Sequence, residues 1–140
     1  MTKSNIKAVI QGDIQRVWKI VTAVEDYTWR SDLSRTEILS EKQFIEYTRT
    51  GYATTFTVTV LEPCKRWEFE MENTNMKGRW IGVFTSVEEG TEIDFTECVA
   101  VKKFFLKPLI KAYLKKQQIQ FLADLNKAVL QKEDPLADER

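Results

Sequence analysis

The hydrophobic pattern near the C-terminus predicts one long amphipathic helix over residues 108–131. Apolar side chains recur there at intervals of three and four, which places them on one helical face. Pro108 suits the first turn, where its missing N–H costs no hydrogen bond. The predicted face comprises Ile110, Tyr113, Leu114, Gln117, Phe121, Leu125 and Ala128. Gln117 is the polar member of this face, and a buried amide needs a partner from the protein, water or a ligand.

Before residue 101 the apolar positions follow a different period, because they alternate with polar positions as in β-strands. Residues 66–72 show this clearly, since an aromatic or methionine side chain alternates there with glutamate. A sheet with one dry and one wet face produces that alternation. The pattern predicts strands at residues 4–10, 34–40, 43–49, 52–61, 66–72, 76–87 and 91–100.

Two short helices are expected between the first and second strands. Asp13 is a suitable N-cap for a helix over residues 14–23, and the second would lie in residues 24–32, where the chain bends into a short helix or a loop. The tail at residues 132–140 is polar and is expected to be frayed. Residues 1–131 are therefore expected to form a single domain.

This order of elements predicts an α+β fold. Short connections pair neighbouring strands as antiparallel hairpins, and a strongly twisted sheet of seven strands curls. The long helix is then expected to lie in the open side of the curl. Such an arrangement leaves a cavity between sheet and helix unless large side chains fill it.

Composition narrows the classes of function. Lys+Arg and Asp+Glu both number 21, so the net charge of +0 argues against broad electrostatic binding to nucleic acid. The sequence contains no histidine, which excludes Ser-His-Asp and Cys-His nucleophile systems and histidine-ligated metals. No cofactor and no metal site is expected.

The two cysteines, Cys64 and Cys98, form neither a disulfide framework nor a metal-binding spacing. The sequence has no long apolar run and no signal-peptide pattern. A reducing cytoplasm is therefore the expected location, with the protein as a monomer or a homodimer.

Five short motifs occur in the order found in one known superfamily. They are Gly12-Asp13-Ile14 with Val17-Trp18, Asp26-Tyr27 with Trp29, Glu62-Pro63 with Arg66-Trp67, Gly90-Thr91-Glu92-Ile93, and Phe121-Leu122 with Leu125-Asn126-Lys127. Together they resemble the START-related superfamily (SRPBCC), also called the helix-grip or birch-pollen-allergen fold. Its bacterial members are often labelled polyketide cyclase/dehydrase or lipid-transport proteins. The resemblance implies a helix-grip domain with a ligand cavity, and it specifies no single function.

Aromatic side chains on the inward faces are the first candidates for a binding site. They are Trp29, Phe56, Trp67, Phe69, Trp80, Phe84, Phe95, Tyr113 and Phe121. Each one alone is explained by core packing. As a group they suggest an aromatic-lined pocket, since ligand cavities combine apolar walls with a few polar groups.

Glu97 is the charged candidate, because strand alternation places it on the same face as Phe95 and Val99. An inward carboxylate there would be desolvated, and its pKa would be raised. It could orient a polar ligand or act as a general base. The alternative is a bulge or register slip, which would turn Glu97 to solvent. Gln117 likewise could bind a ligand or lie at the helix edge near water.

Three hypotheses of function follow. The first is a binding or transport protein for a small hydrophobic or aromatic metabolite or lipid. The second is an enzyme of the cyclase or dehydratase type, for which Glu97 is the candidate acid–base group and no catalytic constellation is recognisable. The third is a protein-interaction module like the chaperone-activating relatives. Lysines around Phe104 and Phe105 are most simply a solvated face, and contact with an anionic membrane is the less favoured interpretation.

Overall fold

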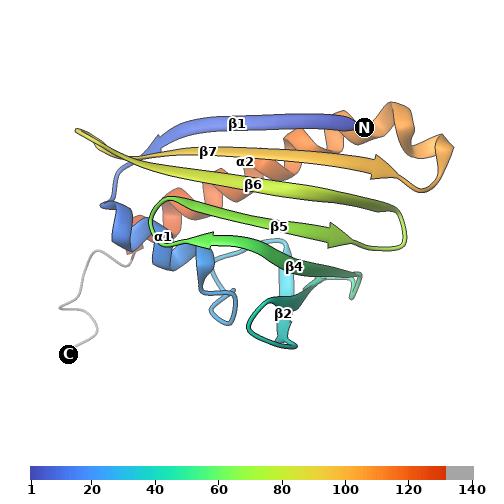
Figure 1. Ribbon diagram of the computed structural model, residues 1–140, viewed down its shortest axis with the longest axis horizontal. Coiled ribbons are helices and arrows are strands. Elements are labelled where there is room, and N and C mark those ends of the chain that lie inside the picture. The colour runs from blue at the N-terminus through green and yellow to red at the C-terminus, as the bar shows by residue number, and fades with distance from the viewer. Residues whose placement is uncertain (132–140) are drawn as a thin grey trace.

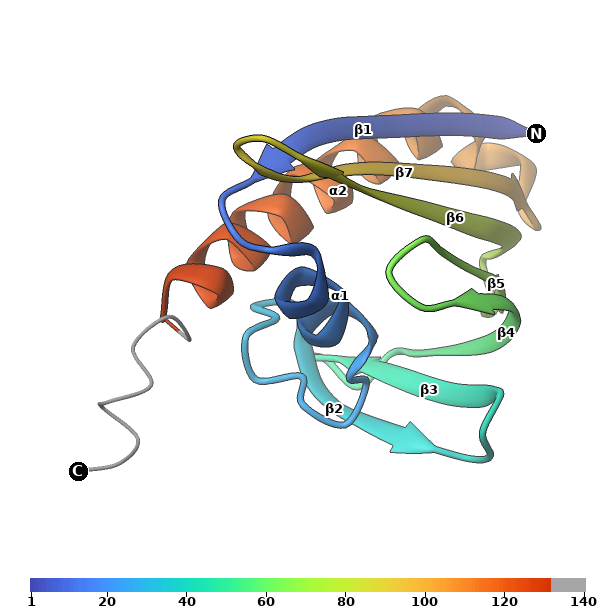
Figure 2. The ribbon, with the colours of Figure 1, turned by 60° about the vertical axis from the view of Figure 1, so that its left-hand side comes forward.

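The computed structural model describes residues 1–131, and the expected frayed tail at residues 132–140 lies outside them. The described residues form a seven-stranded antiparallel sheet in the order β1-β7-β6-β5-β4-β3-β2, with a long helix across its concave side (Figures 1 and 2). The elements are β1 (Thr2–Ile10), α1 (Ile14–Thr22), β2 (Leu33–Ile38), β3 (Gln43–Thr48), β4 (Ala53–Glu62), β5 (Arg66–Glu72), β6 (Met76–Val87), β7 (Gly90–Val101), η1 (Phe104–Leu106) and α2 (Lys107–Gln131). The predicted α+β helix-grip fold is confirmed.

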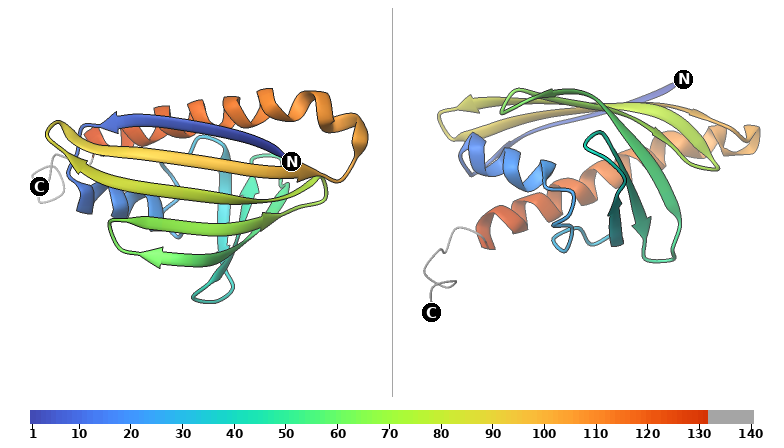
Figure 3. Two further views of the ribbon diagram at one scale, coloured as in Figure 1. Left: turned by 45° about the horizontal axis from the view of Figure 1, so that its top comes forward. Right: turned by 60° about the horizontal axis from the view of Figure 1, so that its bottom comes forward.

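The sheet curves because its strands twist and because two of its strand pairs are irregular. Register shifts interrupt the β2–β3 pair and the β4–β5 pair. Such irregularities increase the local twist and bend the strands. Figure 3 shows the resulting curve, with α1 and the segment after it on the same side of the sheet as α2. The β1–β7 and β6–β7 pairs run without a shift.

The long helix packs against one end of the sheet, mainly against β1 and β7. A buried amide, Gln118, fixes it there. Ser4 of β1 donates its hydroxyl to Gln118 Oε1 at 2.8 Å, and Gln118 Nε2 donates to the carbonyl oxygen of Ser4 at 3.0 Å. Both polar ends of the amide are thereby satisfied, which a buried amide requires. The strands at the other end of the sheet, β2 to β5, pack less closely on α2, so that space remains between them and the helix.

The buried face of α2 is rotated from the predicted one. Gln118 and Asp124 are buried polar residues of the helix, whereas Tyr113 is 46% exposed. Gln117 is only half-buried, so its predicted place in the middle of the buried face is wrong. The reason is the one-sided packing on β1 and β7, which turns Gln118 toward the sheet and leaves Gln117 at the cavity.

The second short helix predicted after β1 is not present. Residues 24–32 form isolated turns, closed by single bonds such as Arg30 N–H to the carbonyl oxygen of Tyr27 at 2.8 Å. Tertiary partners replace the missing helical bonds. The backbone N–H and the hydroxyl of Ser31 both donate to the Asp124 carboxylate of α2 at 2.8 Å. The segment is thereby attached to the long helix.

We expect the end of α2 to be a main source of stability. Leu125 is fully buried, so Leu125→Ala should lower the free energy of unfolding by about 2–5 kcal/mol. Urea denaturation measures this change. Leu130→Ala on the same helix is the matched control, since Leu130 is 61% exposed, and its effect should stay within about 0.5 kcal/mol. Equal effects of the two substitutions would contradict the packing described.

Candidate functional site

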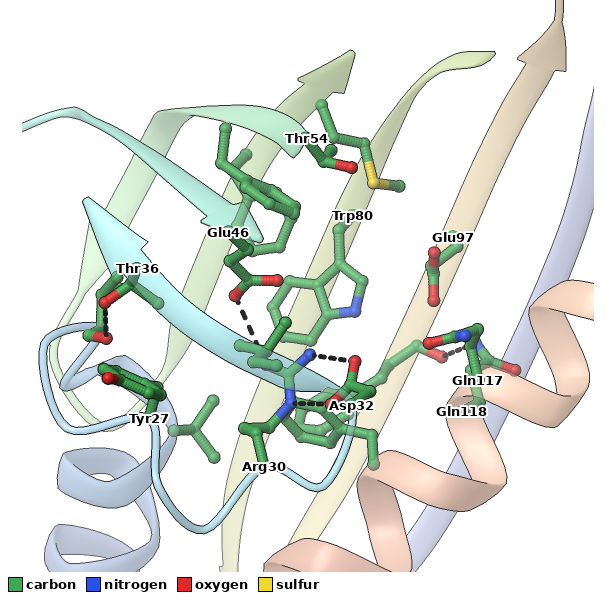
Figure 4. Close-up of a pocket in the computed structure, with 18 of the residues that line it drawn as sticks. Tyr27, Arg30, Asp32, Thr36, Glu46, Thr54, Trp80, Glu97, Gln117 and Gln118 are labelled. Carbon is green, nitrogen blue, oxygen red and sulfur yellow. Dashed lines mark hydrogen bonds and ion pairs between the residues drawn. The ribbon is translucent and has the colours of Figure 1, made fainter. Parts of the chain in front are cut away.

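A cavity of about 190 Å³ lies between the concave face of the sheet, the segment after α1 and the helix α2 (Figure 4). Its apolar wall consists largely of aromatic rings that contact one another. Phe69 stacks on Trp80 with ring centroids 4.9 Å apart, and Trp80 in turn contacts Phe95 at 4.7 Å. Phe44 and Phe56 form a second stack at 4.9 Å. This mutual packing fixes the rings, so the cavity wall is rigid and apolar.

Most residues predicted to face a ligand do border this cavity. They are Trp29, Phe56, Trp67, Phe69, Trp80, Phe95, Glu97, Tyr113, Gln117 and Phe121. Phe84 is the exception and is not part of the lining. It is 3% exposed and packs edge-on against Trp18 of α1, with ring centroids 4.9 Å apart. Phe84 lies further along β6 than Trp80, in the part of the core that α1 covers.

Glu97 points into the cavity, as strand alternation indicates. It is paired across the strands with Ser4 on β1 and Trp80 on β6, in registers that run without a shift. A bulge that would turn it to solvent is therefore absent from β7. No described residue gives its carboxylate a hydrogen bond or an ion pair. Figure 4 shows it between Trp80 and Gln117.

The unpartnered position of Glu97 changes its protonation. Burial raises the pKa of Glu97 from its ordinary 4.5 to about 7, and Glu46 adds to this rise while Arg30 opposes it. The side chain keeps part of its surface because it borders the cavity. Desolvation nevertheless dominates, since no hydrogen-bond donor of the protein stabilises the ionised form. Near neutral pH both forms of this group are populated.

A buried ion cluster lies across the cavity from Glu97. Arg30 donates from Nε and Nη2 to the two carboxylate oxygens of Asp32, at 3.1 and 3.0 Å, and from Nη1 to Glu46 at 3.3 Å. Its guanidinium also lies 4.8 Å from the ring centre of Phe121. The three ionic side chains are 15–25% exposed. All three nitrogens of Arg30 are thus engaged.

The two carboxylates dominate the electrostatics of this cluster. Burial raises the pKa of Glu46, and the Asp32 charge raises it further, although Arg30 opposes both. Burial alone would lower the pKa of Arg30, but Glu46 and Asp32 together raise it. The guanidinium therefore stays charged, and it is shared between two acids.

Sequence patterns did not assign Arg30, Asp32 or Glu46 to the site. Arg30 and Asp32 lie in a segment without periodicity. Strand alternation places Glu46 on the same face as Phe44, but only the strand pairing decides whether that face borders the cavity. The sequence signal that could have indicated the cluster is that Arg30 and Asp32 closely follow Trp29, a predicted site residue. Further polar residues of the lining, shown partly in Figure 4, are Tyr27, Thr36, Thr48, Thr54, Asn73 and Gln118.

Tyr113 lies where the cavity meets the surface. Burial raises the pKa of its phenol, and Glu97 adds to this effect. It is the one hydroxyl side chain of α2, and it borders the same cavity as Glu97. Among the residues that the structure describes, no group of acidic or cysteine side chains is arranged to hold a metal ion.

The lysine-rich surface around η1 lies outside the cavity lining. Lys102 pairs with Glu72 at 2.7 Å, and Lys103 donates to Asn75 at 3.1 Å. Phe104 and Phe105 are exposed at 86% and 59%. Within residues 1–131, no helix is both long and apolar enough to cross a membrane.

A curved antiparallel sheet that wraps around a C-terminal helix, with a cavity between the two, is characteristic of a START-like domain. The sequence model of the polyketide cyclase/dehydrase and lipid transport family matches residues 1–130, so the chain belongs to that family. No curated protein sequence matches the chain.

Solved structures share the fold at low sequence identity. A START superfamily protein from Mycobacterium smegmatis has 13% identity and a TM-score of 0.84, covering 92% of this chain and 97% of its own. A conserved protein from Geobacillus kaustophilus has 14% identity and a TM-score of 0.81, covering 93% and 96%. The Aha1 dimer structure from Colwellia psychrerythraea has 18% identity and a TM-score of 0.72, covering 92% and 96%. These likenesses concern the fold, which hosts several functions.

Removing the cation of the ion cluster should destabilise the protein at neutral pH. Arg30→Met would leave Asp32 and Glu46 as uncompensated, largely buried charges, at a cost of about 2–4 kcal/mol. Since the pKa of Glu46 is raised, this carboxylate takes up a proton readily on acidification, and the cost should be smaller at pH 4. Urea denaturation at both pH values measures it.

The exposed pair of Arg35 and Glu37, 3.9 Å apart, supplies the control for that experiment. Arg35→Met should change the free energy of unfolding by less than about 1 kcal/mol at either pH. A loss for Arg30→Met that is as small as this would show that the cluster contributes no more than a surface pair.

Glu97→Gln should stabilise the empty protein at pH 8 and leave its stability almost unchanged at pH 4. The folded protein holds the Glu97 proton more tightly than the unfolded chain, so stability falls as the pH rises from 4.5 to about 7. The gain at pH 8 should be about 1–3 kcal/mol. Glu92→Gln, on the outer face of β7, is the control with no such gain. An NMR titration that places the pKa of Glu97 near 4.5 would contradict the account.

Proposed function

We propose that the protein binds a small, largely apolar molecule with a polar end in the cavity between the sheet and α2. The observation that carries this proposal is the combination of a rigid aromatic wall with one unpartnered inward carboxylate. Apolar contact with the rings supplies affinity, at about 25 cal/mol for each Å² removed from water. The few convergent polar groups supply orientation.

The cavity is lined by aromatic rings and is not filled by side chains of the helix, which supports a site for a ligand. Tyr113, Gln117 and Phe121 of α2 reach the lining but do not fill the space between helix and sheet. A protein that used only its outer surface would gain stability by filling this space. The cavity therefore favours a binding domain over an interaction module, although the fold is shared with the Aha1 structure.

An enzymatic role is the second candidate, and the desolvated position of the Glu97 carboxyl inside the cavity is the observation that favours it. A general acid or base works best when its pKa lies near the working pH, and that of Glu97 is about 7. The cyclase/dehydrase label of the family is consistent with proton-transfer chemistry at such a group. Glu97 would then exchange a proton with a bound substrate, and Gln117 and Tyr113 would orient it.

The binding proposal is tested with a small neutral fluorescent probe, 1-naphthylamine, at pH 8. Thr54 borders the cavity, so Thr54→Trp should fill part of it and weaken probe binding by about tenfold or more. The control Thr55→Trp places the same ring on the outer face of β4 and should bind as the wild type does. Circular dichroism checks that both variants are folded. Equal affinity for the two variants would remove the cavity as the binding site.

Native mass spectrometry separates the binding protein from the enzyme. A molecule that co-purifies with the wild type should have the same mass in Glu97→Gln if the protein only binds it. If Glu97 transfers protons in a reaction, the variant should instead retain a molecule of different mass, the unconverted substrate.

A further inference from the structure

The charges that line the cavity are strongly unbalanced. Asp26, Asp32, Glu46 and Glu97 all border it, whereas Arg30 is the one cationic side chain of the lining within residues 1–131. Even when Asp26, at the edge, is left aside, three carboxylates face a single guanidinium. A desolvated space with such an excess of negative groups attracts positive charge.

The charge of the single cation is already balanced by two carboxylates of the protein. Each nitrogen of the Arg30 guanidinium already donates to Asp32 or Glu46, and its face lies over the Phe121 ring. An anionic ligand would therefore find no unengaged positive group, and it would meet the Glu97 carboxylate at close range. The cavity is unsuited to a carboxylate or a phosphate.

Glu97 is the group that lacks a counter-charge. Its carboxylate enters the cavity from β7, and no described residue supplies an ion pair or a hydrogen bond. The side chains that face it from β1 and β6 are the uncharged Ser4 and Trp80. From α2 it meets Tyr113 and Gln117, and across the cavity Arg30, Asp32 and Glu46.

Aromatic rings lie beside the same position, although one face of Trp80 is already stacked on Phe69. Trp80 is the direct cross-strand partner of Glu97, and such partners hold their Cβ atoms about 4.5–5.5 Å apart. Phe95 lies on the same face of β7, and its ring contacts that of Trp80 at 4.7 Å. The faces of such rings attract cations, most strongly that of tryptophan. A carboxylate beside these rings is a suitable environment for an ammonium group.

We propose that the cavity selects an apolar molecule that carries a protonated amine, with Glu97 as its counter-ion and Trp80 as the ring beside the ammonium. This inference rests on the proposed binding function and names its ligand class. The hydrocarbon or aromatic part of the ligand contacts Phe56, Phe69 and Phe95. The volume of about 190 Å³ suits an amine with a single aromatic ring.

The proposal fixes the sign of the pH dependence. In the empty cavity Glu97 holds a proton below pH 7, because its pKa is about 7. An ammonium ligand stabilises the carboxylate, so its binding releases that proton and its affinity rises between pH 5.5 and pH 8. A ligand that accepts a hydrogen bond from protonated Glu97 would lose affinity over the same range.

Three probes of similar shape test the charge preference: 2-phenylethylamine, 2-phenylethanol and 3-phenylpropionate. Isothermal titration calorimetry of the full chain at pH 8 should give at least about tenfold tighter binding of the amine than of the alcohol, and no binding of the acid. At pH 5.5 the amine should bind about thirtyfold more weakly. The alcohol should change little, because its hydroxyl can accept a hydrogen bond from protonated Glu97 or donate one to the carboxylate.

Substitutions assign the effect to Glu97. Glu97→Gln should weaken binding of the amine by about tenfold or more while the alcohol stays within about threefold. Glu92→Gln removes the same charge from the outer face of β7 and should leave all affinities unchanged. Because Glu97→Gln is expected to fold stably, loss of folding does not obscure the comparison.

The other outcomes overturn the proposal. Equal or tighter binding of the alcohol or the acid would show that the cavity does not select a cation, and amine affinity unchanged in Glu97→Gln would assign the charge to another group. If the neutral naphthylamine probe binds and the three phenyl probes do not, the amine inference fails and the binding proposal stands. If no probe binds, both fail.

Discussion

The packing of α2 against one end of the sheet is the constraint on which the rest of the structure depends. The helix is held to the β1–β7 end of the sheet by the Ser4–Gln118 bonds and to the segment after α1 by the Ser31–Asp124 bonds. A curved sheet that the helix contacts mainly at one end encloses space beneath its other strands. The aromatic residues of β3 to β6 line this space without filling it, and the cavity results from that geometry.

The same packing decides where the charged side chains lie around the cavity. The segment after α1, attached to α2 through Asp124, carries Arg30 and Asp32 to the side of the cavity where Glu46 projects from β3. Glu97 projects from β7 on the other side, where β1 and β6 present no charged side chain inward. Asp32 and Glu46 therefore have a counter-charge in Arg30, and Glu97 has none. This difference in environment distinguishes a structural ion cluster from a candidate functional group.

Membership of the family and likeness to solved structures establish the architecture and leave the chemistry to the site. At identities of 13–18% the shared feature is the sheet wrapped on a helix. The cavity of this chain is set by its own residues, namely an aromatic wall, an arginine already shared by two acids, and an unpartnered glutamate. These features favour a ligand that is apolar over most of its length and positive at one end.

The sequence alone determined the order and type of nearly all elements, because hydrophobic period and turn residues are local properties. It also indicated the inward direction of Glu97, since alternation along a regular strand is local as well. It did not determine whether a bulge reverses that direction, because register depends on pairing with β1 and β6. The helical stripe of α2 was wide enough to be centred on Gln117 or Gln118, and contact with Ser4 decided between them.

Only the tertiary structure decided the ion cluster and the absence of a second short helix. The partners of Arg30 and Ser31 lie on β3 and α2, up to 93 residues away along the chain, and no local pattern encodes such contacts. Phe84 shows the same limit, because its place beneath α1 rather than in the cavity depends on where Trp18 packs. Period and propensity act over a few neighbouring residues, whereas a cavity and its charges arise where distant segments meet.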